Sequence, residues 1–220
     1  MIATRPNELR HEQALEASSF LTEDWYRRHR PGAVIVRANE VIRLLNKAKI
    51  KFIVMGTHGV GGWRSEPRAT RDVDLLVALR HYEKAVSLIH NAYPDLRVID
   101  AIRMTRFRDQ TTGHVVIDVM KPLNDLFRLA FRYTVAAGRS HRVPDLELAL
   151  VCKFAAMISP RRAEEKKFID AGDFIDIVKH NDKNVDVKKL QRLAEKVYKG
   201  GGAEILKMVA DIRAGRRIKI

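Results

Sequence analysis

The spacing of apolar and polar positions divides the chain into a mixed first half and a helical second half. Apolar residues recur at helical intervals in three segments of the first half, residues 7–29, 33–48 and 81–92. Short apolar runs typical of strands alternate with them, at residues 50–55, 72–79, 96–104, 106–107 and 114–120. From residue 124 the spacing is helical almost to the end. This order predicts an α/β (α+β) fold, a mixed β-sheet with flanking helices followed by a helical C-terminal region.

Two breaks in the pattern predict a division into three parts. Pro31 and Gly32 end the first helical segment, and the spacing of apolar residues changes from mixed to helical after Lys121 and Pro122. We therefore expect an N-terminal helical arm, an α/β core and a helical region, over residues 1–32, 33–122 and 123–220. Within the last part the spacing predicts helices at residues 145–158, 161–180, 187–198 and 204–214.

The charge of the chain is strongly positive and narrows the choice of partners. Lysine and arginine number 41 against 27 acidic residues, which gives a net charge of +14. A positive field of this size favours polyanions such as RNA, DNA or nucleotides, although a charge that only maintains solubility is the alternative. The N-terminal residues have no apolar signal segment, and no apolar run approaches the roughly 18 residues needed to cross a bilayer. We expect a cytoplasmic protein with no membrane partner.

A glycine-rich turn directly follows the first short strand. The turn reads Gly-Thr-His-Gly-Val-Gly-Gly from Gly56 to Gly62, after the apolar run 52–55. A strand, a glycine turn and a helix start together form an anion-binding arrangement, because backbone N–H groups and the helix dipole point at the turn. The turn contains no Gly-Lys-Ser/Thr, which excludes a P-loop.

Three aspartates lie at or within predicted strands. Asp72 and Asp74 are two positions apart, so both side chains project from the same face of a strand. Asp118 lies in an otherwise apolar strand, where a carboxylate is costly unless it is paired or binds a cation. The intervening chain is long enough for the two strands to be neighbours. Three carboxylates at one edge suit Mg²⁺ or Mn²⁺; pairing with arginine or capping of a loop is the alternative.

These features resemble the signature of the DNA-polymerase-β-type nucleotidyltransferase superfamily. That signature is an apolar strand, a Gly-Gly or Gly-Ser turn, Asp-x-Asp and a third carboxylate on a later strand. The lead-in Arg68-Ala69-Thr70 is similar to the small branch that includes AbiEii-type toxins. The resemblance covers roughly residues 35–180 and extends to a helix that carries Lys153 among small apolar residues.

The resemblance implies roles for particular residues. Asp72, Asp74 and Asp118 would be the catalytic residues and the metal ligands, with Asp118 as a candidate base toward the acceptor hydroxyl. Gly56 and Thr57 would form the turn against the triphosphate. Thr57 departs from the usual glycine or serine, and its β-branch is expected to restrict the turn.

Further nucleotide contacts are expected from basic residues. Arg68 and Arg71 flank the aspartate motif and are candidates for binding the triphosphate, with a solvated loop or ion pairs to the aspartates as the alternative. Lys153 is a candidate from the helical region, with a lysine that reaches solvent along apolar neighbours as the alternative.

Four other residues are expected to be structural. Trp63 is expected to pack in the core rather than stack on a base. Asp173 and Asp176 lie on one helical face and are expected to pair with lysine or arginine. His58 is expected to be structural or to face solvent.

The sequence therefore supports two hypotheses about function. The first is a magnesium-dependent enzyme that transfers a nucleoside monophosphate from a nucleoside triphosphate to an acceptor hydroxyl. The charge favours an RNA or tRNA acceptor, a protein or an antibiotic-like molecule stays open, and the resemblance implies a toxin with an antitoxin partner. The second is a non-catalytic basic nucleic-acid-binding module on the same fold, which Thr57 and the surplus of basic residues motivate.

Overall fold

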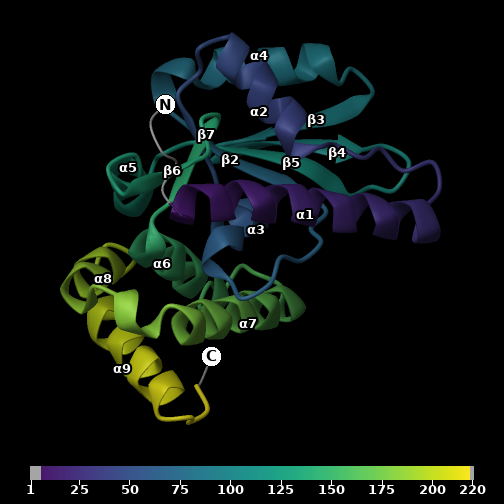
Figure 1. The fold of residues 1–220 in the computed structure, drawn as a ribbon. Helices are drawn as coiled ribbons and strands as arrows, with labels where there is room; N and C mark the ends of the chain where they lie inside the picture. Colours follow the sequence, from purple (N-terminus) through teal and green to yellow (C-terminus); the bar gives the residue numbers. More distant parts are fainter. Residues whose placement is uncertain (1–5, 219–220) are drawn as a thin grey trace. The chain divides into compact units, whose positions relative to one another are not determined.

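A computed structural model describes residues 6–218 of the chain. The chain forms two compact units, each described by itself below (Figure 1). The first unit comprises Met1–Gly62 and Glu66–Val143, and the second comprises Trp63–Ser65 and Pro144–Ile220.

The first unit contains the sheet and the helices around it. Its helices are α1 (Pro6–His29), α2 (Ala38–Lys47), α3 (Gly56–Val60), α4 (Tyr82–Ala92) and α5 (Asp125–Ala130), with a short 3₁₀ turn at Leu79–His81. A second 3₁₀ turn, Gly61–Trp63, ends on a residue of the second unit. Its strands are β1 (Phe52–Val54), β2 (Val73–Val77), β3 (Leu96–Ala101), β4 (Met104–Asp109), β5 (Val115–Met120), β6 (Thr134–Ala137) and β7 (His141–Pro144).

A mixed five-stranded sheet in the order β1-β2-β5-β4-β3 forms the centre of the first unit. β2 and β5 are parallel, and the other neighbouring pairs are antiparallel. Figure 1 shows α2 and α4 over one face of this sheet. The predicted mixed sheet with flanking helices is confirmed.

Alternation along the strands separates a core face of the sheet from a face that carries polar groups. In β2, Val73, Leu75 and Val77 are at most 1% exposed and belong to the hydrophobic cluster. Asp74 lies between two of them and projects to the opposite face. Burial of the apolar set fixes the register, since a slip of one residue would turn Asp74 into the core.

Two stretches differ from the sequence-based expectation. Residues 33–37 are not helical, and α2 begins at Ala38 after an extended Arg37. Residues 134–144 form a β-hairpin, β6–β7, where helix was expected. Gly138, with φ +56°, provides the turn of this hairpin and donates its backbone N–H to the Glu8 carbonyl of α1.

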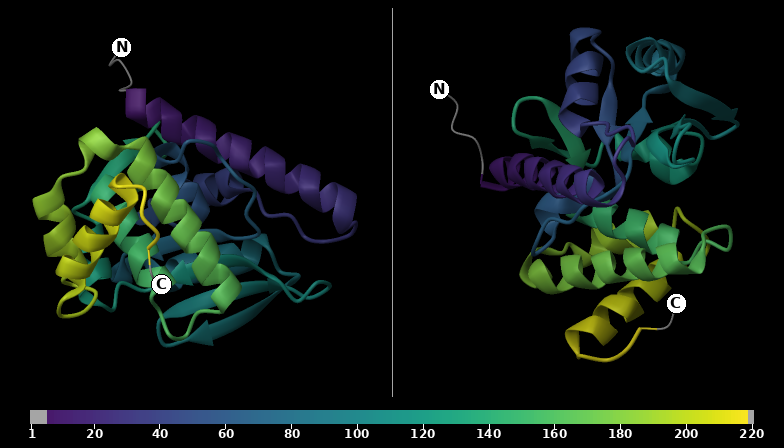
Figure 2. Two further views of the ribbon diagram at one scale, coloured as in Figure 1. Left: turned by 90° about the horizontal axis from the view of Figure 1, so that it is seen from below. Right: turned by 90° about the vertical axis from the view of Figure 1, so that its right-hand side faces the viewer.

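The units divide at residue 144 because the hairpin packs with the N-terminal helix. α1 contacts β6 and α3 and so belongs to the first unit. Figure 2 shows α1, in purple, as one uninterrupted helix from two further directions. The three-part division expected from sequence stays a prediction, and residues 1–5 of the expected arm lie outside the described residues.

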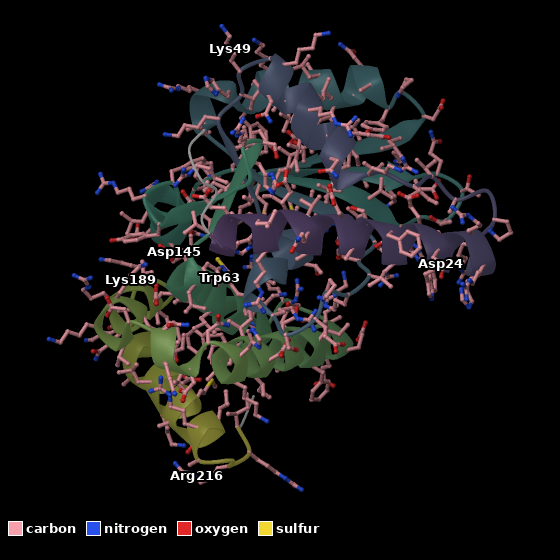
Figure 3. All side chains as sticks on the ribbon, in the orientation of Figure 1. Asp24, Lys49, Trp63, Asp145, Lys189 and Arg216 are labelled. Atoms are coloured by element: carbon pink, nitrogen blue, oxygen red, sulfur yellow. The ribbon has the colours of Figure 1, made fainter. Side chains whose placement is uncertain are left out.

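The second unit is built from helices. They are α6 (Leu146–Met157), α7 (Glu164–His180), α8 (Val187–Ala194) and α9 (Gly201–Arg213), with a 3₁₀ turn at Asp182–Asn184. Lys189 of α8 lies 2.7 Å from both Asp145 and Glu147 at the start of α6; Asp145 and Lys189 are labelled in Figure 3. Trp63 is buried and donates its Nε1–H to the Pro144 carbonyl at 2.9 Å, so the expected packing role is confirmed.

No helix within residues 6–218 is long and apolar enough to span a bilayer.

Lys49, labelled in Figure 3, occupies a backbone conformation that favours glycine. Its φ is +56°, and its N–H donates to Asn46 while that of Ile50 donates to Leu45, which is a Schellman cap on α2. We expect Lys49→Gly to raise the free energy of unfolding by about 0.5–1 kcal/mol, because the left-handed strain is relieved. Urea denaturation measures the change.

The matched control is Lys47→Gly, two residues earlier in the last turn of α2. This change should lower the free energy of unfolding by about 1 kcal/mol, since glycine is a poor helix former. Equal effects of the two substitutions would contradict the strain at Lys49.

Candidate active site

Strand pairing brings the three aspartates together. Asp74 of β2 and Asp118 of β5 are register partners on adjacent parallel strands, so their side chains project side by side from one face. Asp72 immediately precedes β2. One carboxylate oxygen of each residue lies within 4.8 Å of those of the other two, and all three residues are partly buried. The cluster expected from sequence forms, and its role in holding a metal stays a prediction.

The chemistry of the donor set fits a hard divalent cation. Three carboxylates at this separation repel one another, and the repulsion is strongest where burial lowers the dielectric constant. Arg106 of β4 is the cation opposite Asp118, with Nε 3.3 Å from Oδ1. This ion pair offsets part of the negative charge of the cluster. Oxygen ligands of this kind suit Mg²⁺ or Mn²⁺, which retain water and take phosphate oxygens as further ligands.

Gly56 is required at the edge of this cluster for two reasons. Its φ is +58°, and a Cβ at this position would overlap the Asp74 carboxylate. The backbone also joins the two segments, because the Met55 N–H donates to the Asp74 carbonyl at 2.8 Å. The start of the glycine turn therefore lies directly against the candidate metal ligands.

Thr57 does not occupy the strained position of the turn. It is buried in the first turn of α3, and the left-handed conformation falls on Gly56. The expected restriction by its β-branch therefore does not act on the turn itself, because the helical conformation is open to threonine. Contact of Thr57 with a nucleotide stays a prediction.

Hydroxyl groups of α1 hold the loop that leads into Asp72. The Thr70 hydroxyl donates to Asp72 Oδ1 at 2.9 Å. The Thr70 backbone N–H donates to Thr22 Oγ1 at 3.0 Å, and the Ser18 hydroxyl donates to the Arg68 carbonyl. Sequence reasoning missed Ser18 and Thr22; their i, i+4 spacing, which places both on one face of α1, was the available signal.

The two arginines that flank the motif lie in different surroundings. Arg68 is half-buried, and its Nη1 donates to the neighbouring Ala69 carbonyl at 3.1 Å. Arg71 is exposed with Nη1 3.5 Å from His114 Nε2, and it lines a small cavity with Asp72. Nucleotide binding by either residue stays a prediction.

Lys153 of α6 lies inside an ion cluster of the second unit. Its Nζ is 2.9 Å from Asp170 and 2.6 Å from Asp173 of α7, and its side chain is 7% exposed. Lys153 is thus paired in the interior rather than reaching solvent along its apolar neighbours. Its binding of a nucleotide stays a prediction.

Arg64 completes the ion pairs on α7. Its Nε lies 3.4 Å from Asp173 and 3.2 Å from Asp176. The expectation that both aspartates serve as salt-bridge partners is therefore confirmed.

Arg106 is the residue near the aspartates that sequence reasoning missed. The available signal was the run Gln110-Thr111-Thr112-Gly113, which is typical of a hairpin turn, because folding the chain back there sets Arg106 opposite Asp118. A bulge at Phe107 and Arg108 shifts the pairing beyond that point.

Three buried histidines lie near the site. They are His11 of α1, His58 of α3 and His141 of β7. Burial is the largest cause that lowers the pKa of each to about 4; repulsion from His141 contributes to the lowering at His11 and His58, whereas the nearby Asp72 opposes it at His58. Within the described residues, His58 Nδ1 and His141 Nε2 meet no hydrogen-bond partner. These imidazoles are held neutral, and the expected structural role of His58 agrees with its burial.

Comparison with known proteins gives similarity to solved structures alone. No protein-family model matches the chain, and no curated protein does. An antigenic nucleotidyltransferase-like protein from Paracoccidioides brasiliensis has a TM-score of 0.49 at 16% identity, over 83% of this chain and 92% of its own. The antibiotic-resistance factor ANT(2″)-Ia has a TM-score of 0.48 at 12% identity, over 80% and 93%. JHP933 from Helicobacter pylori has a TM-score of 0.47 at 12% identity, over 97% and 94%. At these identities the likeness concerns the fold alone.

The buried histidines predict a loss of stability in mild acid. A folded-state pKa of about 4, below the ordinary value of 6.5, means that protons bind the unfolded chain first. The free energy of unfolding should therefore fall as the pH drops from 6.5 toward 4, by about 1.4 kcal/mol per pH unit for each histidine. Urea denaturation at pH 7.5, 6.0 and 5.0 measures the slope. His141→Gln should reduce the slope of unfolding free energy against pH by the contribution of about one proton. A slope of zero in the parent protein would contradict the lowered pKa values of the three histidines.

Gly56→Ala tests whether the turn is shaped to the carboxylates. The added methyl should displace Asp74, lower Mn²⁺ affinity by roughly tenfold or more and cost at least about 1 kcal/mol of stability. Titration calorimetry measures the affinity. Gly113→Ala is the matched control, because Gly113 has φ +70° and open space around it. That control should lose stability and retain Mn²⁺ affinity; loss of affinity in both variants would contradict the prediction.

Proposed function

We propose that the chain is a divalent-metal-dependent nucleotidyltransferase. It moves a nucleoside monophosphate from a nucleoside triphosphate to an acceptor hydroxyl. The observation that carries this proposal is the convergence of Asp72, Asp74 and Asp118 within 4.8 Å, directly against a glycine turn. The resemblance of the chain's sequence to the polymerase-β-type signature supports the same reaction.

The three carboxylates are the residues that would hold Mg²⁺ or Mn²⁺. When bound, the cation would neutralise charge on the phosphates and on the attacking oxygen. The chain itself contributes the fixed spacing of the carboxylates, which comes from the register of β2 and β5.

The order of groups along the sheet supports the following proposed positions for the two substrates. The triphosphate lies at Gly56 and Thr57, next to Asp74. Arg68 and Arg71 come from the loop before Asp72 and supply positive charge toward the phosphates. The acceptor hydroxyl lies at Asp118, on the side of the cluster away from the turn.

The transfer exchanges one phosphoester bond for another. The acceptor oxygen attacks the α-phosphorus, and its proton passes to the carboxylate of Asp118 as base. The bond from the α-phosphorus to the bridging oxygen breaks, and pyrophosphate leaves with the electron pair.

The net charge of +14 supports RNA, including tRNA, as the acceptor. A toxin role with an antitoxin partner rests on the motif from Arg68 to Asp74 and stays a prediction of that resemblance.

Asp74→Asn tests the proposed reaction. This isosteric change removes one negative charge from the cluster, so transfer of label from α-³²P nucleoside triphosphates to RNA should fall by about 100-fold or more. Gel electrophoresis of the RNA after incubation with each triphosphate and Mg²⁺ measures the transfer. Asp24→Asn, at a partly exposed residue of α1, is the matched control and should retain the parent rate.

Absence of transfer by the parent protein with all four triphosphates would overturn the reaction. RNA binding that ignores both Mg²⁺ and the Asp74→Asn change would then favour the non-catalytic binding module.

A further inference from the structure

An arginine-rich sheet face begins immediately beside Asp118. Arg106 of β4 is the register partner of Asp118, and Arg108 follows two positions later on the same face. On the next strand, Arg97 of β3 is the register partner of Arg108. We call Arg97, Arg106 and Arg108 the arginine face.

The opposite face of these strands supplies the core, so the arginine face points away from it. Phe107, between the two arginines of β4, is fully buried in the hydrophobic cluster, and Leu96 of β3 is buried beside it. The strand positions of β3 and β4 that share the face of Asp118 include no acidic residue; they are Arg97, Ile99, Ala101, Met104, Arg106 and Arg108.

The arginines are accessible to a ligand. The Arg106 side chain is 45% exposed, Arg97 is exposed and Arg108 is half-buried. The Arg108 Nε is itself buried and meets no hydrogen-bond acceptor among the described residues. A guanidinium in that position can still gain a charge-assisted hydrogen bond from a phosphate.

The sheet order places this face on the acceptor side of the candidate site. The glycine turn adjoins Asp74 on β2, Asp118 follows on β5, and Arg106 follows on β4. A triphosphate at the turn therefore lies at one end of this row, and a molecule that approaches Asp118 from the other end meets the arginine face first.

We infer that the arginine face binds backbone phosphates of a single-stranded RNA acceptor, and that Arg106 exchanges Asp118 for such a phosphate. This inference rests on the proposed function and identifies the residues that select the acceptor. Three arginines with no acidic residue on their own face of β3 and β4 attract a polyanion and repel a polycation such as an aminoglycoside. Ile99 and Met104 offer apolar contact between the charges, and an open sheet suits an unpaired strand whose bases are exposed.

The pairing of Arg106 with Asp118 also predicts competition with a metal ion. Arg106 and a divalent cation are attracted to the same carboxylate, so each weakens the binding of the other. When a cation occupies the aspartates, the guanidinium is repelled from them and becomes available to a phosphate of the acceptor. Loss of Arg106 should therefore change the binding of metal and of RNA in opposite directions.

The experiment measures both ligands on the same variants without requiring catalysis. Fluorescence anisotropy gives the affinity for a labelled single-stranded RNA at 5 to 10 salt concentrations, which together span about one decade. Electron paramagnetic resonance gives the affinity for Mn²⁺. We expect Arg106→Gln to lower RNA affinity by roughly tenfold, to lower the salt slope by about 0.7, and to raise Mn²⁺ affinity by roughly threefold.

Two further variants complete the design. Arg97→Gln with Arg108→Gln should weaken RNA binding and leave Mn²⁺ affinity unchanged, because neither arginine pairs with the aspartates in the structure. Arg43→Gln, at an exposed arginine of α2, is the control and should change neither. Opposite shifts of RNA and Mn²⁺ affinity in Arg106→Gln cannot result from unfolding.

The remaining outcomes overturn the inference in distinguishable ways. RNA affinity that survives all three arginine changes removes the arginine face as the acceptor site, and tighter arginine-dependent binding of DNA of the same sequence removes RNA as its occupant. Competition of tobramycin with RNA for the arginine face would contradict the expectation that this face repels polycations. Absence of transfer with the expected binding shifts overturns the proposed function and leaves the inference standing, whereas absence of Mn²⁺ binding by the parent protein overturns both.

Discussion

Mutual repulsion among three carboxylates is the constraint on which the candidate site depends. Asp74 and Asp118 are neighbours because β2 and β5 are parallel and in register, and that register is fixed by the apolar residues on the opposite face. The core thus holds like charges close together that would separate in a flexible loop. Gly56 is part of the same constraint, since only a residue without a side chain leaves room for the Asp74 carboxylate. The core thereby maintains the cluster of like charges that the proposed cation site requires.

The sequence predicted the parts of this site that follow from strand periodicity. The two-residue spacing of Asp72 and Asp74, and the cost of Asp118 in an apolar strand, were sufficient to expect a cluster. Arg106 was missed because its position depends on the pairing of β4 with β5, which is a property of two strands and of a turn between them. The β6–β7 hairpin was missed because short strands and helices share apolar spacing over so few residues, and packing against α1 decides between them.

The expected restriction of the glycine turn by the β-branch of Thr57 is absent for a related reason. A glycine-rich run contains several positions that can adopt a left-handed conformation, and the sequence does not say which one does. In the structure Gly56 takes it, and Thr57 enters the helix. The contribution of α1 was likewise invisible from residue types alone, since serine and threonine are common on helix surfaces. Ser18 and Thr22 gain significance only because the loop carbonyls and N–H groups lie within reach of them.

Under the proposed function, the distribution of charge within the first unit would set the order in which ligands bind. The three carboxylates would repel triphosphate and RNA alike, although the chain as a whole carries +14. Arg106 cancels part of that charge, but in doing so it is withheld from any phosphate. In the proposed reaction, a divalent cation would relieve both conditions at once, because it would neutralise the aspartates and displace the guanidinium. Binding of anionic substrates would then be coupled to prior binding of the cation through one carboxylate, Asp118, and by linkage the substrates would strengthen the binding of the cation in return.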